Sequence, residues 1–153
     1  MRFVIHESAE GAWFVLEDQA HQVILVSRLF RNANWCRAGI QAIVDLMSET
    51  NMRKKTVSND PMFQDRFSEC VYIDADGLVR FALITGLGNV LANSRAYQTL
   101  NAYNNEITWV CRKIRGAHLV KGEGIPHIQP TGRNFSDLRM ERAADFAFSN
   151  ARV

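Results

Sequence analysis

The sequence has few cysteines, and its positive and negative charges nearly balance. The three cysteines, Cys36, Cys70 and Cys111, are odd in number and widely spaced, which excludes a fully paired disulfide framework and matches no zinc-ligand spacing. This cysteine usage is typical of a reducing compartment, so we expect a cytoplasmic protein. The formal net charge of +2 predicts neither a polyanion-binding protein nor an acidic partner, and any argument from charge must be local.

Long apolar runs are missing as well. No segment approaches the roughly 18 apolar residues of a membrane span, and the N-terminal stretch MRFVIHESAEG lacks the apolar core of a signal peptide. We therefore expect a soluble protein with no membrane partner. A chain of 153 residues, 47% of them hydrophobic, can bury a core as one domain or as two very small ones.

An internal repeat is the main feature that is present. The stretch SRLFRNANWCRAGI, residues 27–40, returns 67 residues later as SRAYQTLNAYNNEI, residues 94–107. Three β-rich segments precede each copy: RFVIHE, AWFVLE and QVILVS before the first, and CVYID, VRFALI and NVLANS before the second. Short segments of this composition, separated by turn residues, predict three strands at the start of each unit.

Helical periodicity follows the strands in both units. Apolar residues at a spacing of three and four predict one amphipathic helix through 36–47 and another through 103–114. A possible fourth strand comes after each helix, at 53–58 and 117–122. In the tail, Ser136 is a suitable N-cap for a third helix. The predicted organisation is a first repeat at 1–60, a connector at 61–67, a second repeat at 68–123 and a C-terminal tail at 124–153.

A unit of about 60 residues buries too little surface to be comfortably stable alone. We therefore expect an α+β fold in which tandem β-β-β-α-β repeats form one antiparallel sheet with both helices on one face. Such a pseudo-dimer is either a monomer with an internal pseudo-twofold axis or part of a homodimer. The tail helix has two possible docking sites, the open face of the sheet and the outer side of the two helices.

The shared pattern also resembles a known family. The pattern consists of a strand, a glycine turn, FxL, then QVI or NVL, then SR with an aromatic residue two positions later, and AGI or NEI within a helix. It is similar to that of the YegP-like domain, a small family of unknown function. The resemblance covers about residues 1–122. It implies a β3-α-β module assembled as a tandem repeat or a dimer, in which the last strands can be exchanged between the halves.

No pattern predicts catalytic, cofactor or metal residues. The four histidines, His6, His21, His118 and His127, show no ligand spacing. The glycines of TGLGN join two predicted strands and so favour a hairpin over a phosphate loop. Turn formation explains the aspartates that precede Gly77. The sequence therefore predicts a protein that is not an enzyme.

Four large side chains are candidates for an interaction surface. Alternation places Trp13 and Arg80 on the open sheet face, and Trp35 and Trp109 lie away from the main buried stripes of the helices. Exposed apolar surface of this kind indicates a partner, so we predict a protein-interaction or regulatory module.

Local basic clusters leave nucleic-acid binding as the alternative. They lie near the ends of the predicted helices and in the last strand, where the candidate phosphate contacts are Arg53, Lys54, Lys55, Arg112, Lys113, Arg115 and Lys121. Cations at helix C-termini also stabilise the helix dipole, which explains most of them without a ligand.

The repeated pairs Ser27-Arg28 and Ser94-Arg95 allow two interpretations. They stabilise the junction between strand and helix, or two related arginines hold an anionic ligand between the halves. We favour the junction, because a fold with two similar units needs the same junction twice.

Overall fold

Seven strands and two α-helices make up the described part of the chain. The computed structural model describes residues 1–48, 67–85, 88–124, 126–132, 134–135 and 138. The elements are β1 (Arg2–Ser8), β2 (Gly11–Glu17), β3 (Val23–Ser27), α1 (Ala33–Ser48), β4 (Phe67–Ile73), β5 (Val79–Thr85), β6 (Val90–Ser94), α2 (Leu100–Lys113), a 3-10 turn (Ile114–Gly116) and β7 (His118–Lys121).

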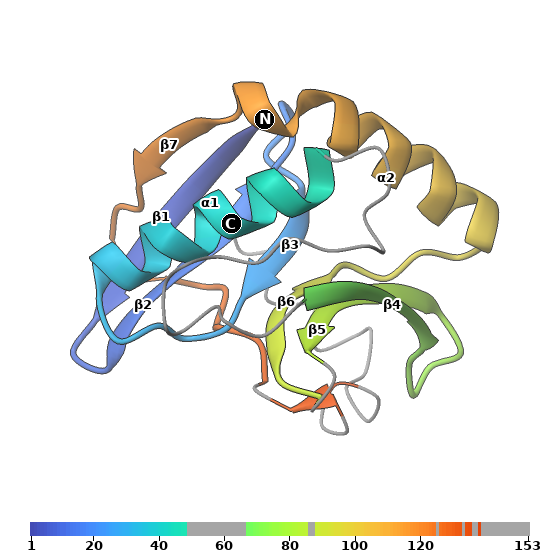
Figure 1. The fold of residues 1–153 in the computed structure, drawn as a ribbon, viewed down its shortest axis with the longest axis horizontal. Coiled ribbons are helices and arrows are strands. Elements are labelled where there is room, and N and C mark those ends of the chain that lie inside the picture. The colour runs from blue at the N-terminus through green and yellow to red at the C-terminus, as the bar shows by residue number, and fades with distance from the viewer. Residues whose placement is uncertain (49–66, 86–87, 125, 133, 136–137, 139–153) are drawn as a thin grey trace.

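All seven strands belong to one sheet, in the order β4-β5-β6-β3-β2-β1-β7 (Figure 1). Strands β1 to β3 and β4 to β6 are two antiparallel meanders, and β3 and β6 join them in antiparallel pairing with Val26 opposite Asn93. The expectation of a fully antiparallel sheet is wrong at one edge, where β7 runs parallel to β1. The helix α2 carries the chain from β6 to the far edge of the sheet, where β7 pairs with β1.

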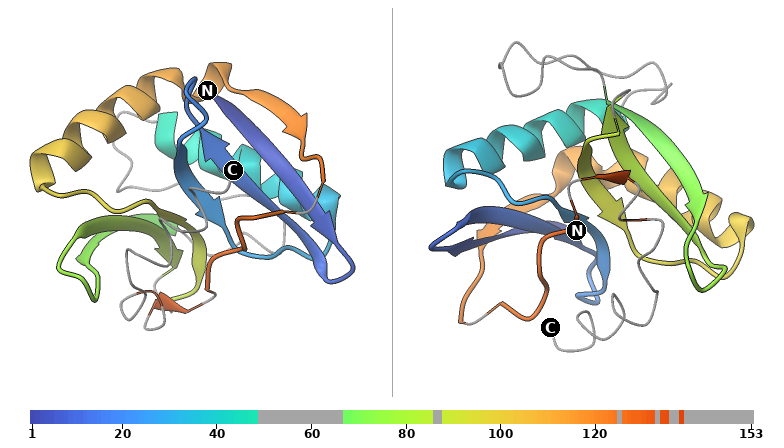
Figure 2. Two further views of the ribbon diagram at one scale, coloured as in Figure 1. Left: turned by 180° about the vertical axis from the view of Figure 1, so that it is seen from behind. Right: turned by 90° about the horizontal axis from the view of Figure 1, so that it is seen from below.

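Both helices pack on the same face of the sheet, as predicted (Figures 1 and 2). The main core lies between these two layers. Phe14 and Phe81 contribute from the sheet, Ile43 from α1, and Tyr103 and Val110 from α2. The predicted helical stripes are confirmed, because their members are buried or packed against this core. No helix within the described ranges is long and apolar enough to cross a membrane.

Short polar side chains define where several elements begin and turn. Thr99 caps α2, since its hydroxyl accepts a hydrogen bond from the Ala102 amide at 3.1 Å. Asp74 organises the turn between β4 and β5, because its Oδ1 accepts from the amides of Asp76 and Leu78 at 2.8 and 3.0 Å. The turn interpretation of the aspartates before Gly77 therefore holds for Asp74.

The tail packs on the second face of the sheet, which was expected to be open. Ile128 packs with a cluster around Trp13 and Val15, and Leu138 and Phe135 pack with a cluster around Tyr72. The described tail residues therefore occupy one of the two predicted docking sites, the face of the sheet. The predicted third helix falls outside the described residues apart from Leu138, and the predicted strand at 53–58 lies outside them entirely.

Candidate functional site

Trp13 and Arg80 do not form an exposed surface. Trp13 is 3% exposed and Arg80 is fully buried. The indole Nε1 of Trp13 donates a hydrogen bond to the carbonyl of Ile128 at 3.0 Å, which ties the tail to the sheet. The prediction that these two side chains meet an external partner is therefore wrong, because the tail segment occupies the surface that strand alternation assigned to solvent.

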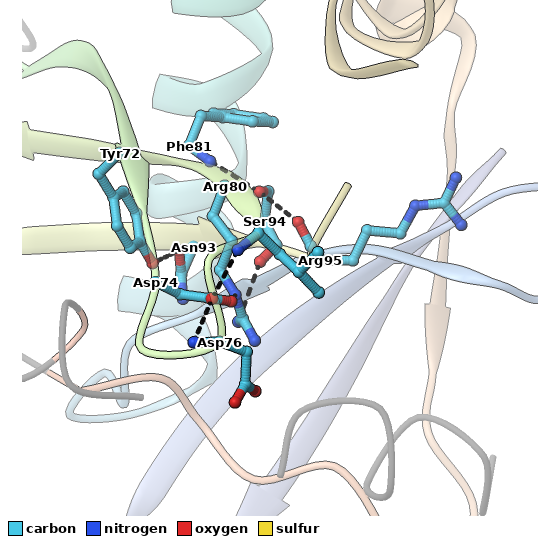
Figure 3. Close-up of polar contacts among 9 residues, drawn as sticks. Tyr72, Asp74, Asp76, Arg80, Phe81, Asn93, Ser94 and Arg95 are labelled. Atoms are coloured by element: carbon cyan, nitrogen blue, oxygen red, sulfur yellow. Dashed lines mark hydrogen bonds and ion pairs between the residues drawn. The ribbon is translucent and has the colours of Figure 1, made fainter. Parts of the chain in front are cut away.

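Arg80 belongs to a buried polar network on this covered face (Figure 3). Its Nε donates to Asp74 Oδ2 at 2.9 Å, and both side chains are fully buried. Nearby, the Tyr72 hydroxyl donates to Asn93 Oδ1 at 2.7 Å. Burial of two charges is tolerated only when they are paired and hydrogen-bonded, which is the case here. Since no charged atom of the ion pair reaches solvent, this network is structural.

The two Ser-Arg pairs form the same backbone junction. The Ser27 hydroxyl accepts from the Phe14 amide at 2.9 Å and donates to the Arg28 carbonyl at 2.8 Å. Ser94 makes the same two contacts, with the Phe81 amide and the Arg95 carbonyl, at 2.8 and 2.7 Å. These contacts support the junction interpretation over an anion site.

Arg95 in addition forms a fork-like ion pair. Its Nε and Nη2 donate to the two carboxylate oxygens of Glu106 at 2.9 and 2.6 Å, linking the junction to α2. Burial lowers the pKa of Arg95, but the Glu106 carboxylate and the Tyr97 side chain together outweigh burial, so the pKa is raised. Glu106 is the only carboxylate of α2, so the helix presents no unpaired acidic side chain.

A basic aromatic surface remains on the solvent side of α2. Trp109 is 38% exposed, in agreement with the prediction. Arg112 and Lys113 are exposed and follow at a spacing of three and four residues, which places them beside Trp109 on the helix. We refer to Trp109, Arg112 and Lys113 as the α2 patch.

The other predicted residues lie in the core, on the surface or outside the described residues. Trp35 is half-buried and packs against the main core, so it offers less surface than expected. Arg115 and Lys121 are exposed, and Arg115 lies 4.0 Å from Asp45. The first basic cluster, Arg53, Lys54 and Lys55, lies outside the described residues.

Burial suppresses the acidity of two thiols. It raises the pKa of Cys36 to about 12 and that of Cys111 to about 11. Nucleophilic chemistry requires the thiolate, so neither side chain is activated near neutral pH. Within the described ranges, no three His, Cys, Asp or Glu side chains are grouped as metal ligands.

A cavity that the sequence did not indicate lies between the outer strands and the tail. It measures about 440 Å³ and lies over β1 and β7 on the tail side of the sheet. Gly122 and Glu123, which follow β7, and Pro126 to Ile128 of the tail line one side of the space. The described residues that line it are Arg2, Val4, His6, Glu17, Val120, Lys121, Gly122, Glu123, Pro126, His127 and Ile128.

The polar part of this cavity comes from the first two strands. Arg2 Nε donates to Glu17 Oε1 at 2.8 Å, and the Glu17 side chain is 3% exposed whereas that of Arg2 is 38% exposed. The His6 ring packs against Trp13 with 5.5 Å between centroids. Burial lowers the pKa of His6, and the negative charge of Glu17 partly opposes this. His6 is therefore mainly neutral at pH 7.

The absence of a side chain at Gly122 makes room for His6. A Cβ at this position would lie 2.4 Å from His6 Nδ1, while the Gly122 amide donates to the Ile5 carbonyl at 2.7 Å. This contact could not be predicted from the sequence, because His6 and Gly122 are brought together only by the parallel pairing of β7 with β1.

The fold is similar to two solved solution NMR structures. YegP from E. coli, a protein of unknown function, superposes with a TM-score of 0.61 at 16% identity, over 81% of this chain and 94% of that chain. The UPF0339 protein of Shewanella oneidensis gives 0.58 at 18% identity, over 78% and 89%. The chain thus has a YegP-like fold. No family model and no curated protein matches the sequence.

Proposed function

We propose that this protein is a non-enzymatic interaction module that binds an acidic segment of a partner protein through the α2 patch. The observation that carries the proposal is the exposure of Trp109 beside two exposed cations. Tryptophan and arginine are enriched among the residues that dominate binding energy at protein interfaces.

The charge of α2 favours an acidic partner. Its single carboxylate, Glu106, is engaged by Arg95 and half-buried, while Arg112 and Lys113 are exposed. A surface with one sign of charge steers a partner of the opposite sign and excludes partners of the same sign. The indole of Trp109 adds apolar area beside these two cations. A peptide that alternates carboxylates with an apolar residue would match both features.

Nucleic-acid binding is the second candidate, because phosphates would also pair with Arg112, Lys113, Arg115 and Lys121. The observation that favours it is the exposure of all four cations. It has less support than protein binding, since the buried Trp13 and Arg80 offer bases no stacking surface on the sheet.

We infer further that the chain is a tandem repeat folded as a pseudo-dimer, acting in the cytoplasm as a monomer or a homodimer. The Arg28 amide donates to the Leu91 carbonyl at 3.0 Å, and the Arg95 amide donates to the Ile24 carbonyl at 3.1 Å. A shift of 67 residues exchanges these two contacts, which is what a pseudo-twofold axis between β3 and β6 requires.

Photo-crosslinking in living cells tests the α2 patch directly. Trp109 is replaced by p-benzoylphenylalanine, and the matched control carries the same group at Asn104, an exposed residue on another side of the helix. We expect a discrete protein adduct from position 109 alone, and its loss when Arg112→Glu and Lys113→Glu are added. The adduct's partner should contain an acidic segment at the crosslinked site.

The same experiment separates the two candidates. A nucleic-acid adduct from position 109 would support the alternative and contradict the proposal. Equal adducts from positions 109 and 104, or none from either, would contradict both. With the identified partner in purified form, Trp109→Ala should weaken binding by at least about tenfold, the range of an interface hot spot.

A further inference from the structure

We propose that the cavity over β1 and β7 is a binding site for a small organic monocarboxylate with an apolar body. The site is independent of the α2 patch, because it lies on the opposite face of the sheet from the helices. At about 440 Å³ it falls within the range of small-molecule sites, and it combines apolar walls with a few polar groups, as such sites do.

Arg2 supplies the anion-binding group. Its Nε is already held by Glu17, and among the described residues the other two guanidinium nitrogens make no hydrogen bond. The Arg2 side chain is 38% exposed and lines the cavity, whereas the Glu17 side chain is almost completely buried. Because Glu17 fixes the orientation of Arg2 without occupying all of its donors, the guanidinium is preorganised to bind a carboxylate in a bidentate way.

The other residues that line the cavity favour a ligand with an apolar body. Val4 and Val120 are paired across β1 and β7 and follow Arg2 along the sheet, and Ile128 closes the cavity from the tail. His6 stands at the far end, four residues from Arg2, which corresponds to about 13 Å along a strand. A ligand with its carboxylate on Arg2 would therefore place an apolar body on the valines and reach toward a neutral imidazole.

The surrounding charges favour one negative charge over several. Glu17 lies directly beside Arg2, and the exposed residues Glu123 and Lys121 also line the cavity. Lys121 is paired with Ile5, which belongs to the core on the helix side, so strand alternation directs the lysine side chain away from the cavity floor. A phosphate or diphosphate would bring two or more negative charges close to these carboxylates, at an unfavourable Coulomb energy. A cationic ligand is disfavoured as well, since the reachable charge on the floor is the guanidinium.

Titrations followed by NMR on the full chain test the site, with benzoate as the probe. Benzyl alcohol, benzylamine and inorganic phosphate are the comparison ligands. We expect saturable shifts at the amides of Val4, His6 and Val120 with benzoate, and an affinity at least about tenfold higher than for benzyl alcohol, the amount a charge-assisted bidentate contact supplies.

Two variants check the assignment. Arg2→Gln with Glu17→Gln removes both charges together, which avoids a buried unpaired carboxylate, and should abolish the preference for benzoate. Val120→Trp should block the cavity from an edge strand and remove all binding. Arg37→Gln, at an exposed arginine of α1, is the control and should bind benzoate as the natural protein does.

The proposal is overturned by equal affinity for benzoate and benzyl alcohol, by tighter binding of phosphate or benzylamine, or by a preference for benzoate over benzyl alcohol that persists in the double variant. Absence of any shift at these three amides in the natural protein would overturn it too.

Discussion

Trp13 and Arg80 occupy the same place in the two copies of the sequence repeat, 67 residues apart, yet the structure uses them differently. Trp13 donates to the carbonyl of Ile128 in the tail, whereas Arg80 pairs with Asp74 in the turn of its own half. The helix-facing side of the sheet repeats closely, with Phe14 in one half and Phe81 in the other, both fully buried. The two halves therefore share a core and differ on the face that the tail covers.

Removing the charge of Arg80 should have the largest effect. Arg80→Met leaves Asp74 as an unpaired charge in a fully buried position, so we expect a loss of about 3–5 kcal/mol in the free energy of unfolding. Urea denaturation followed by circular dichroism measures it.

Two further variants sharpen this comparison of the halves. Addition of Asp74→Asn to Arg80→Met should recover part of the loss, because asparagine keeps the acceptor for the turn without the buried charge. Trp13→Phe, which loses one hydrogen bond to the tail, should cost only about 0.5–1.5 kcal/mol. A Trp13→Phe variant as unstable as Arg80→Met would contradict the assignment of the ion pair as the more sensitive contact.

The junction serines should show an intermediate and equal effect. Ser27→Ala and Ser94→Ala each leave a buried strand amide, that of Phe14 or Phe81, without its acceptor, and we expect a loss of about 1–3 kcal/mol in both cases. Thermal and urea unfolding of the two variants side by side provide the measurement. A difference of more than about 1 kcal/mol between them would show that the junctions are not equivalent.

The smallest effect concerns His6. It is paired with Trp13 in the first half as Tyr72 is paired with Arg80 in the second, so His6 and Tyr72 occupy matching positions. Burial lowers the pKa of His6 in the folded protein, so below about pH 6.5 the unfolded chain binds a proton more readily than the folded one. The contribution of neutral His6 to the stability of the folded protein is complete above that pH and is lost progressively as the pH falls. Urea midpoints between pH 7.5 and 5 should therefore decline less for His6→Gln than for the natural protein.

His118→Gln, at an exposed histidine of β7, is the control for the removal of an imidazole. The same slope of stability against pH in His6→Gln and in the natural protein would refute the role of His6 burial.

The candidate site could be predicted only in part. Trp109 and the cations that follow it were found because helical spacing alone determines which side chains share a face. The cavity was missed because Arg2 and Val120 come from opposite ends of the chain. Trp13 was misplaced because alternation predicts which face a side chain occupies and does not predict what later covers that face.

The strands, the two helices, their buried stripes and the repeated Ser-Arg junction could all be predicted from the sequence. These features depend on periodicity and on contacts within one unit, both of which are local. Three features required the folded chain: the parallel pairing of β7 with β1, the position of the tail across the sheet, and the ion pair between Arg80 and Asp74. These outcomes depend on which distant segments bury each other's surface, and that choice is made by the packing of the whole chain.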